Sequence, residues 1–425
     1  MQDRMKEMTI RLMEDERVFA VLMAFICALV LIAVQITDSW YDVDNYYDQI
    51  SQILAGHMPY SDVMFEYPPF AAVFMIIPAL FTWDRESYHF AFAILVYIFL
   101  ILGVYFLRKI SDEYIGSRWQ ANLFVILLVG VCTHFIICRY DVFPAVMVVI
   151  SLWFYFRKKY VPAFLIMSLA AMTKLYPVLF LVPMAMPFLV QKDWKRFITA
   201  IVVSGAACLL TELPFILNDP STAFAWMSYH SDRGLQVEAF ISSFILLGSL
   251  FVQSDITLVH NYGSYNLEGA LPDMIAPYMN IVMVAAVGLF ILAMLVKMWK
   301  SKDSVRDMDA QCAVFCLALV LIFILFSKVY SAQYVIWIIL LLPFTQLASL
   351  EENHRLEAMV LMVPFLIATF LAYSMMVFLI EMNPGAIVLQ VIKNMMHLIL
   401  TVAVIHFCWC EMTGKTHCLL YNRKA

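Results

Sequence analysis

The sequence predicts an all-α, polytopic helical membrane protein. Of its 425 residues, 64% are hydrophobic and only 14% are charged, whereas about 25% of residues are charged in soluble domains. Long apolar stretches recur between Val18 and Cys410, and such stretches are typical of membrane-spanning helices. The composition therefore excludes a soluble globular fold and disfavours disorder, nucleic-acid binding and a disulfide-stapled secreted fold.

The apolar stretches predict a succession of helices along the chain. They fall at 18–37, 68–82, 88–107, 121–138, 142–156, 160–174, 176–190, 197–213, 277–297, 310–327, 331–348, 356–380 and 386–409, with a shorter stretch at 240–253. Several are shorter than the roughly 20 residues that cross a bilayer core, so some helices are tilted, broken at proline or do not cross. We expect about 11–13 transmembrane helices with structured outer loops, in a single integral membrane domain over residues 1–425.

The first apolar stretch is expected to remain as a membrane helix. Basic residues precede it between Arg4 and Arg17, and no small-residue cleavage site follows it, so the segment does not resemble a cleaved signal peptide. Because basic residues flank membrane helices on the cytoplasmic side, we expect a cytoplasmic N-terminus.

Charges in the connecting segments divide by sign. No lysine or arginine lies between Arg17 and Arg85, and Arg233 is the only such residue in 214–276, where carboxylates are frequent. By the positive-inside rule, 38–67 and 214–276 are extracytoplasmic loops. The basic clusters, which we expect to be cytoplasmic, lie at 108–109, 157–159, 192–196, 297–306 and 423–424.

These assignments agree only if 68–82 does not cross the membrane. If both 68–82 and 88–107 crossed, the next basic cluster would lie outside, so we expect 68–82 to lie along or dip into the outer face. Arg139, Lys174 and Lys328 then also face outward. We therefore expect the unusual polar clusters to gather on the extracytoplasmic side.

Acidic and aromatic residues alternate in the outer loop 38–67. Asp42 and Asp44 precede Tyr46, and Glu66-Tyr67 follows a Gly-His-Met-Pro turn. This pattern favours a structured, partly buried segment, although a solvated loop is the alternative for any single acid. A carboxylate held within hydrogen-bonding reach of a sugar hydroxyl can act as a general base.

Further polar groups interrupt or flank the apolar stretches. They are Arg139-Tyr140-Asp141, Lys174, Tyr229–Glu238 and Lys328–Tyr334. Charges near a membrane interior are costly and are typical of functional sites, and a basic group beside a broken helix suits a phosphate. The alternatives are a polar turn for 139–141, snorkelling of Lys174 to the interface, and solvated outer loops or interfacial anchors for the other two.

The sequence lacks the motifs of nucleotide, metal or acyl chemistry. It has no P-loop, GxGxxG, HExxH or nucleophile elbow, and its nine cysteines lack metal-binding spacing. Asp42 and Asp44 alone are too few to hold a divalent cation, so we expect neither a metal nor a cofactor. Without a Rossmann-like domain for a nucleotide sugar, chemistry on the outer face needs an activated donor that is itself in the membrane.

Several of these motifs, in this order, resemble those of glycosyltransferase family 87. They are Asp42-x3-Tyr46, Gly56-x2-Pro59-Tyr60-x-Asp62, Glu66-Tyr-Pro-Pro, Arg139-Tyr-Asp141-x2-Pro144, Lys174-Leu-Tyr-Pro177, Asp232-Arg-Gly-x-Gln236-x-Glu238 and Lys328-x2-Ser331-x-Gln333-Tyr334-x2-Trp337. The resemblance spans residues 40–343. Asp44, close to Asp42, and Ala332, where relatives often have proline, depart from the family pattern.

The resemblance implies a GT-C-type enzyme of the cell membrane with its active site at the extracytoplasmic face. The expected donor is a polyprenyl phosphate carrying mannose, another hexose or a pentose, and the expected acceptor is a hydroxyl of a glycolipid or glycan. By position, Asp42 is the expected base, Asp44 competes with it, and Asp141 is a second acid. The residues expected to bind substrate or phosphate are Tyr46, Tyr60, Glu66, Tyr67, Arg139, Lys174, His230, Arg233, Glu238, Lys328, Gln333 and Tyr334.

Two other classes of function compete with an inverting glycosyltransferase. A membrane transporter or lipid flippase also places charges near proline breaks, but it predicts an internal repeat and polar groups near the bilayer midplane. We find no convincing repeat, and the polar groups lie at helix ends. A non-catalytic scaffold leaves the paired charges unexplained. The expected partners are therefore the lipid-linked donor, the acceptor and membrane lipids, without nucleic acid.

Overall fold

The computed structural model describes residues 14–115, 118–132, 135–231, 233–252, 254–300, 308–345 and 352–413. Within these ranges, five helices are long and apolar enough to cross a membrane. They are α2 (Glu16–Thr37), α5 (Arg85–Ile110), which continues as a π-helix over Ser111–Ile115, α11 (Trp194–Asn218), α14 (Ala270–Lys300) and α20 (Pro384–Thr413). The predicted fold class, an all-α polytopic membrane protein, is confirmed.

The other helices are shorter. They are α3 (Tyr41–Leu54), α4 (Ala71–Ala79), α6 (Trp119–Cys132), α7 (Phe135–Cys138), α8 (Val142–Phe156), α9 (Tyr160–Ala171), α10 (Val178–Val190), α12 (Ala225–Ser231), α13 (Phe240–Ser249), α15 (Met308–Phe326), α16 (Val335–Ile339), α18 (Glu352–Ser374) and α19 (Met376–Ile380). At 9 and 10 residues, α4 and α13 are too short to span a bilayer core alone.

Over the described residues, the helix predicted at 331–348 is a shorter and irregular apolar helical stretch, Ala332–Phe344, and residues 346–348 lie outside the described part of the chain. The stretch consists of a 3₁₀ turn at Ala332–Tyr334, the five-residue α16 and a second 3₁₀ turn at Leu342–Phe344. Proline at 343 has no N–H to donate to the carbonyl of residue 339, where α16 ends, so it weakens the continuation of α16.

The chain divides into two compact units. Unit 1 comprises Met1–Phe188, Asp193–Met227 and Val335–Pro343, and unit 2 comprises Leu189–Lys192, Ser228–Tyr334 and Phe344–Ala425. The candidate site residues from the first half of the sequence belong to unit 1, and those from His230 to Tyr334 belong to unit 2.

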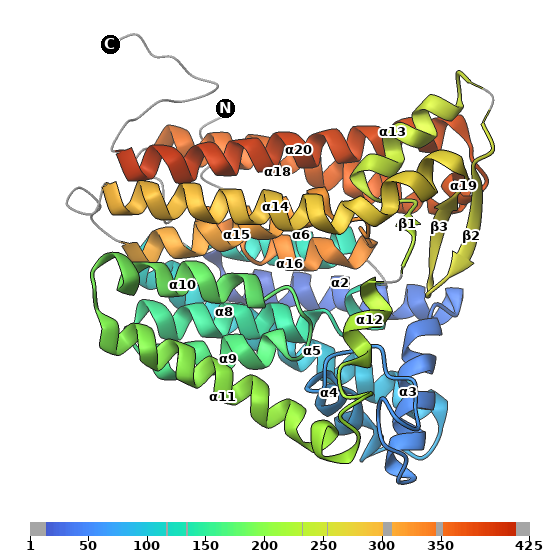
Figure 1. The fold of residues 1–425 in the computed structure, drawn as a ribbon, viewed down its shortest axis with the longest axis horizontal. Helices are drawn as coiled ribbons and strands as arrows, with labels where there is room; N and C mark the ends of the chain where they lie inside the picture. The colour runs from blue at the N-terminus through green and yellow to red at the C-terminus, as the bar shows by residue number, and fades with distance from the viewer. Residues whose placement is uncertain are drawn as a thin grey trace. The chain divides into compact units, whose positions relative to one another are not determined.

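Helix α8 is the centre of unit 1. It is apolar on all sides, so it is stable inside a helix bundle or in lipid but not in water, and the rest of the protein buries twelve of its residues. It packs against α5 and α9, and α9 packs against α11 (Figure 1). The polar turns before α8 and after α9 are thereby held against one another at one end of this helix group.

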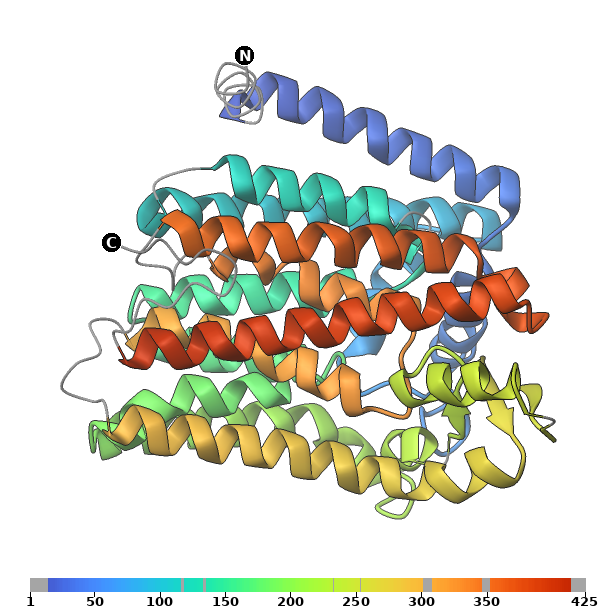
Figure 2. The ribbon, with the colours of Figure 1, turned by 90° about the horizontal axis from the view of Figure 1, so that it is seen from above.

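Helix α15 has the same role in unit 2. Its residues from Cys312 to Leu321 are all buried, and it packs against α14 and α20. Figure 2 shows the orange α18 beside the red α20, in agreement with their contacts. An apolar helix inside each unit leaves the charged side chains at helix ends or on one face of a neighbouring helix.

The segment 214–276 contains a small sheet that the sequence analysis did not predict. The strands β1 (Leu235–Gln236), β2 (Thr257–Asn261) and β3 (Ser264–Glu268) pair antiparallel in the order β1-β3-β2. The two-residue loop Tyr262-Gly263 has φ values of 49° and 65°. Positive φ at both positions is the requirement of a type I′ hairpin, and a glycine there meets it without steric cost.

Candidate active site

Four charged residues that the sequence analysis treated as separate motifs lie together in unit 1. Asp42 is in the first turn of α3, Arg139 and Asp141 are in the short turn between α7 and α8, and Lys174 is in the turn between α9 and α10. The predicted helices at 160–174 and 176–190 are each shorter in the structure, so Lys174 lies on non-helical backbone.

The first of the two ion pairs joins Asp42 to Arg139, whose Nη1 donates to Oδ1 of the carboxylate. Both side chains are largely covered, with exposures of 19% for Asp42 and 23% for Arg139. Burial raises the pKa of Asp42, Arg139 opposes this, and the nearby carboxylates of Glu66 and Asp141 raise it further. Asp42 therefore binds a proton more readily than a solvated aspartate does, as a general base requires.

The second ion pair joins Asp141 to Lys174 across 2.7 Å. The Asp141 side chain is 0% exposed, and its Oδ1 also accepts a hydrogen bond of 2.7 Å from Nε1 of Trp337 in α16. Its second oxygen, Oδ2, has no hydrogen-bond partner among the residues that the structure describes. Lys174 is only 16% exposed, so it is held by the carboxylate and does not snorkel into solvent.

Aromatic rings enclose this charged group. Nζ of Lys174 lies 4.6 Å from the ring centroid of Tyr140 and 5.2 Å from that of Trp337. Tyr176 stacks on Trp337 with 4.2 Å between ring centroids. Cation–π contacts of this length favour the ammonium form, whereas burial lowers the pKa of Lys174.

Three tyrosines continue the aromatic surface toward Asp42. The ring centroid of Tyr67 lies 5.7 Å from that of Tyr46 and 4.9 Å from that of Tyr140. The hydroxyl of Tyr67 donates to Oε1 of Glu66 at 2.6 Å, and the hydroxyl of Tyr60 donates to the Tyr67 carbonyl at 2.7 Å. Burial raises the pKa of Tyr46 and Tyr67 well above the ordinary value, so both are neutral phenols that can donate hydrogen bonds.

Asp44, the competing base, has different partners. Residues two apart on a helix do not share a face, and Asp44 Oδ1 contacts Nε2 of His89 at 2.8 Å and Nη1 of Arg85 at 3.2 Å, both on α5. The His89 ring stacks on Trp40 with 4.7 Å between centroids. Through these contacts Asp44 joins α3 to α5, which is a structural role.

The predicted residues of unit 2 form a second polar cluster around β1. The backbone N–H of Gln236 donates to the carbonyl of Lys328 at 3.0 Å, and Nε2 of Gln236 lies 3.2 Å from Oε2 of Glu238 and 3.1 Å from Oγ of Ser331. Glu238 and Lys328 are buried. Gln333 is also buried, and Tyr334 is half-buried in the 3₁₀ turn that follows Ser331.

Two further predicted residues of unit 2 have other surroundings. Nη2 of Arg233 donates to the carbonyl of Tyr262 at 2.5 Å and lies 3.3 Å from Oγ of Ser264, so it supports the hairpin turn. His230 is in the last turn of α12, and its side chain lies outside the described part of the chain, as does Asp232. The prediction that Lys174, Arg233 and Lys328 share one phosphate stays a prediction.

A polar stripe on α20 was not predicted from the sequence. Its members are buried, and apart from the adjacent pair Lys393 and Asn394 they follow one another at intervals of three or four residues, which places them on one face of the helix; they are Gln390, Lys393, Asn394, His397 and Thr401. Nε2 of Gln390 donates to the Glu238 carbonyl at 2.8 Å, and Nδ2 of Asn394 donates to Oγ of Ser243 at 2.7 Å. This spacing within an apolar stretch is the signal that could have identified the stripe.

Lys393 is the unusual member of this stripe. Its side chain is fully buried, and Nζ lies 3.8 Å from the ring centroid of Tyr330 and 5.8 Å from that of Tyr373. Within the described residues Nζ has no hydrogen-bond partner.

Trp337 was also not predicted as a site residue, although it ends one of the motifs that resemble family 87.

Comparison with known proteins agrees with these motifs. The family model described as glycosyltransferase family 87 matches residues 65–327. No curated protein matches the chain. The matched residues include both turns that hold Arg139, Asp141 and Lys174, as well as β1. The match covers more than half of the 425 residues, and the chain therefore belongs to glycosyltransferase family 87, a family of GT-C-type enzymes.

Proposed function

We propose that this glycosyltransferase moves a sugar, mannose in the first instance, from a polyprenyl phosphate to a hydroxyl of a glycolipid or glycan. We place the reaction at the extracytoplasmic face of the cell membrane, with the N-terminus in the cytoplasm. The observation that carries the proposal is the covered carboxylate of Asp42, paired with Arg139 beside Glu66 and three tyrosine rings. Family membership favours this class of function over a transporter or flippase.

The proposed reaction is a single displacement with inversion. The acceptor oxygen attacks the anomeric carbon while its proton passes to Asp42, and the bond between that carbon and the phosphate oxygen breaks. The electron pair leaves with the polyprenyl phosphate. A base with a raised pKa accepts this proton more readily than an ordinary aspartate, and the raised pKa of Asp42 supports the assignment.

Fixed positive charge would stabilise the leaving phosphate. Arg139 contributes a guanidinium whose Nε is buried and has no hydrogen-bond partner among the described residues. A planar guanidinium can bind a carboxylate and a phosphate oxygen through different N–H groups. Arg139 can therefore contact the phosphate while it still orients Asp42, and preorganised donors of this kind are a principal source of catalysis.

The test compares two isosteric substitutions on the same helix. We expect Asp42→Asn to reduce sugar transfer by about a hundredfold to ten-thousandfold, because the amide cannot accept the proton. Asp44→Asn is the matched control: it weakens the contacts to His89 and Arg85, so we expect lower thermal stability with most of the transfer activity kept. The measurement uses purified full-length protein with radiolabelled polyprenyl-phosphate mannose, with a nucleotide-linked mannose as a second donor.

Each part of the proposal has its own refuting result. An active Asp42→Asn enzyme that is folded would remove Asp42 as the base, and loss of activity only in Asp44→Asn would assign the base to Asp44. Transfer from the nucleotide-linked sugar and not from the polyprenyl phosphate would refute the lipid-linked donor. An unchanged anomeric configuration in the product would refute inversion.

A further inference from the structure

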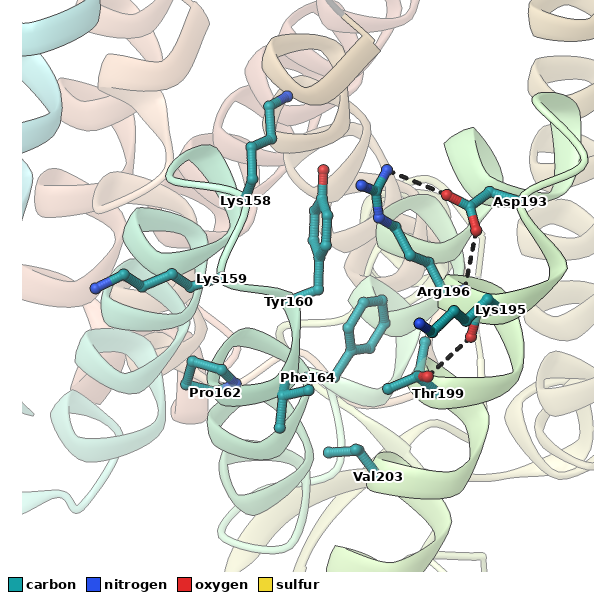
Figure 3. Close-up of a pocket in the computed structure, with 12 residues that line it drawn as sticks. Lys158, Lys159, Tyr160, Pro162, Phe164, Asp193, Lys195, Arg196, Thr199 and Val203 are labelled. Atoms are coloured by element: carbon teal, nitrogen blue, oxygen red, sulfur yellow. Dashed lines mark hydrogen bonds and ion pairs between the residues drawn. The ribbon is translucent and has the colours of Figure 1, made fainter.

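Unit 1 has a cavity at the ends of α8 and α9 that are remote from the candidate active site. Its volume is about 560 Å³, and its lining comes from the turn between α8 and α9 and from the first turns of α9 and α11 (Figure 3). Helix α8 begins directly after Asp141 and ends at Phe156, so its 15 residues separate the two regions by about 22 Å along the helix axis. The mechanism proposed above uses none of the residues that line this cavity.

The rim of the cavity is strongly basic. Lys158, Lys159, Lys195 and Arg196 line it, together with a single carboxylate, Asp193. Asp193 is already engaged, because its Oδ2 lies 3.1 Å from Nη1 of Arg196 and its Oδ1 accepts from the Arg196 backbone N–H at 3.1 Å. The rim therefore carries a net positive charge of about three, which favours an anionic ligand.

These basic residues lie on ordered backbone. At the end of α8, the N–H of Lys159 donates to the carbonyl of Phe154 at 2.9 Å, and Lys158 has a φ of 58°. The turn before α11 has the same pattern, with the N–H of Asp193 donating to the carbonyl of Phe188 at 2.8 Å. Both turns resemble the closing motif of a helix C-terminus, so the backbone next to these basic residues is held in place.

The wall of the cavity is apolar, in contrast to its rim. Phe164 and Ala200 are buried in it, and Val161 and Val203 also line it. Figure 3 shows the Tyr160 ring between Lys158 and Arg196, and the Arg196 guanidinium lies 5.3 Å from the ring centroid. A site with positive charge at its mouth and hydrocarbon below suits a ligand with an anionic head and an apolar tail.

We propose that this cavity binds the headgroup of an anionic glycerophospholipid in the leaflet opposite the active site. The basic rim contacts the phosphate, and the acyl chains continue along the outward side of α11. That side is strongly apolar, since Ile198, Ile201 and Val202 are more than half exposed. Basic cavities between membrane helices are recognised binding places for anionic lipid headgroups.

The test measures lipid retention and not sugar transfer, so it is independent of the proposed reaction. Full-length protein in detergent is titrated with phosphatidylglycerol or phosphatidylcholine, and bound lipid is counted by native mass spectrometry. We expect one phosphatidylglycerol to be retained in preference to phosphatidylcholine. In the double variant Lys159→Gln/Lys195→Gln this retention should weaken about 25-fold, at about fivefold for each lysine. Both side chains are exposed, so we expect the variant to fold.

A matched control removes the same charge elsewhere. Lys297→Gln/Lys300→Gln lies at the last turn of α14, outside the cavity, and should leave retention unchanged. Equal weakening in both double variants would overturn the proposal in favour of diffuse attraction to surface charge. Retention of phosphatidylcholine equal to that of phosphatidylglycerol would also overturn the proposal. So would displacement of bound phosphatidylglycerol by soluble glycerol 3-phosphate as efficient as its displacement by added phosphatidylglycerol.

Discussion

Replacing Lys174 by methionine tests the buried ion pair at the centre of the candidate active site. The change removes the ammonium 2.7 Å from a carboxylate that is 0% exposed and leaves Asp141 with its hydrogen bond from Trp337. Breaking a buried pair by removing one partner costs about 3–5 kcal/mol, because the remaining charge is uncompensated. For a unit of this size, we expect the apparent unfolding temperature to fall by about 6–20 °C.

The double variant Lys174→Met/Asp141→Asn separates stability from donor binding. Replacing both charges removes the uncompensated carboxylate, so most of the lost stability should return, and the amide oxygen at 141 can still accept from Trp337. We expect the Lys174 ammonium also to contact the donor phosphate. The KM for donor should therefore be higher than in wild type in Lys174→Met, and it should remain higher in the double variant. The assay is thermal unfolding in nanodiscs, followed by steady-state transfer at varied donor concentration.

Two results would refute this reasoning. An unchanged unfolding temperature in Lys174→Met would show that the Lys174 ammonium is not needed to compensate the buried charge of Asp141. A KM for donor that returns to the wild-type value in the double variant would remove Lys174 from the donor site and leave it with the structural role alone.

The remaining predictions concern pH and the α20 stripe. Burial and the neighbouring carboxylates raise the pKa of Asp42 above its ordinary value of 3.8, so kcat/KM should fall at acid pH with an apparent pKa above 3.8. Glu66→Gln removes one of these carboxylates and should lower that apparent pKa. An apparent pKa that is the same in Glu66→Gln and in wild type would contradict the assignment of Asp42. Asn394→Leu removes donors to the carbonyls of Glu238 and Ala239 at 3.3 and 3.2 Å, so it should cost about 1–3 kcal/mol; an unfolding temperature equal to that of wild type would count against it.

Much of the helical architecture could be predicted because it depends on local composition. A run of apolar residues long enough to cross a bilayer predicts a helix wherever it occurs in the chain. The predicted helices at 18–37, 142–156 and 386–409 agree with α2, α8 and α20. At 331–348 the described residues form a shorter helical stretch, Ala332–Phe344, in which regular α-helix is limited to α16 and Pro343 lies in a 3₁₀ turn.

The sheet in 214–276 was missed for a related reason. Two of its strands are only five residues long, and β1 has two, so an alternating pattern has too few positions to be distinguished from a loop. The β2–β3 turn, Tyr262-Gly263, was the available signal, and it identifies a hairpin only when both φ values are known to be positive.

By itself, the sequence determined the fold class, the family resemblance and the residue types available for chemistry, because composition and motif order are properties of the chain alone. Only the tertiary structure decided which charges neutralise each other. Asp141 meets Lys174 from another turn and Trp337 from nearly 200 positions away, and a motif does not specify such distant contacts. Asp42 and Asp44 differ by two positions, yet the direction of α3 gives one Arg139 and the other His89 as its partner. Helix packing sets these pairings, since it decides which face of each helix meets which neighbour.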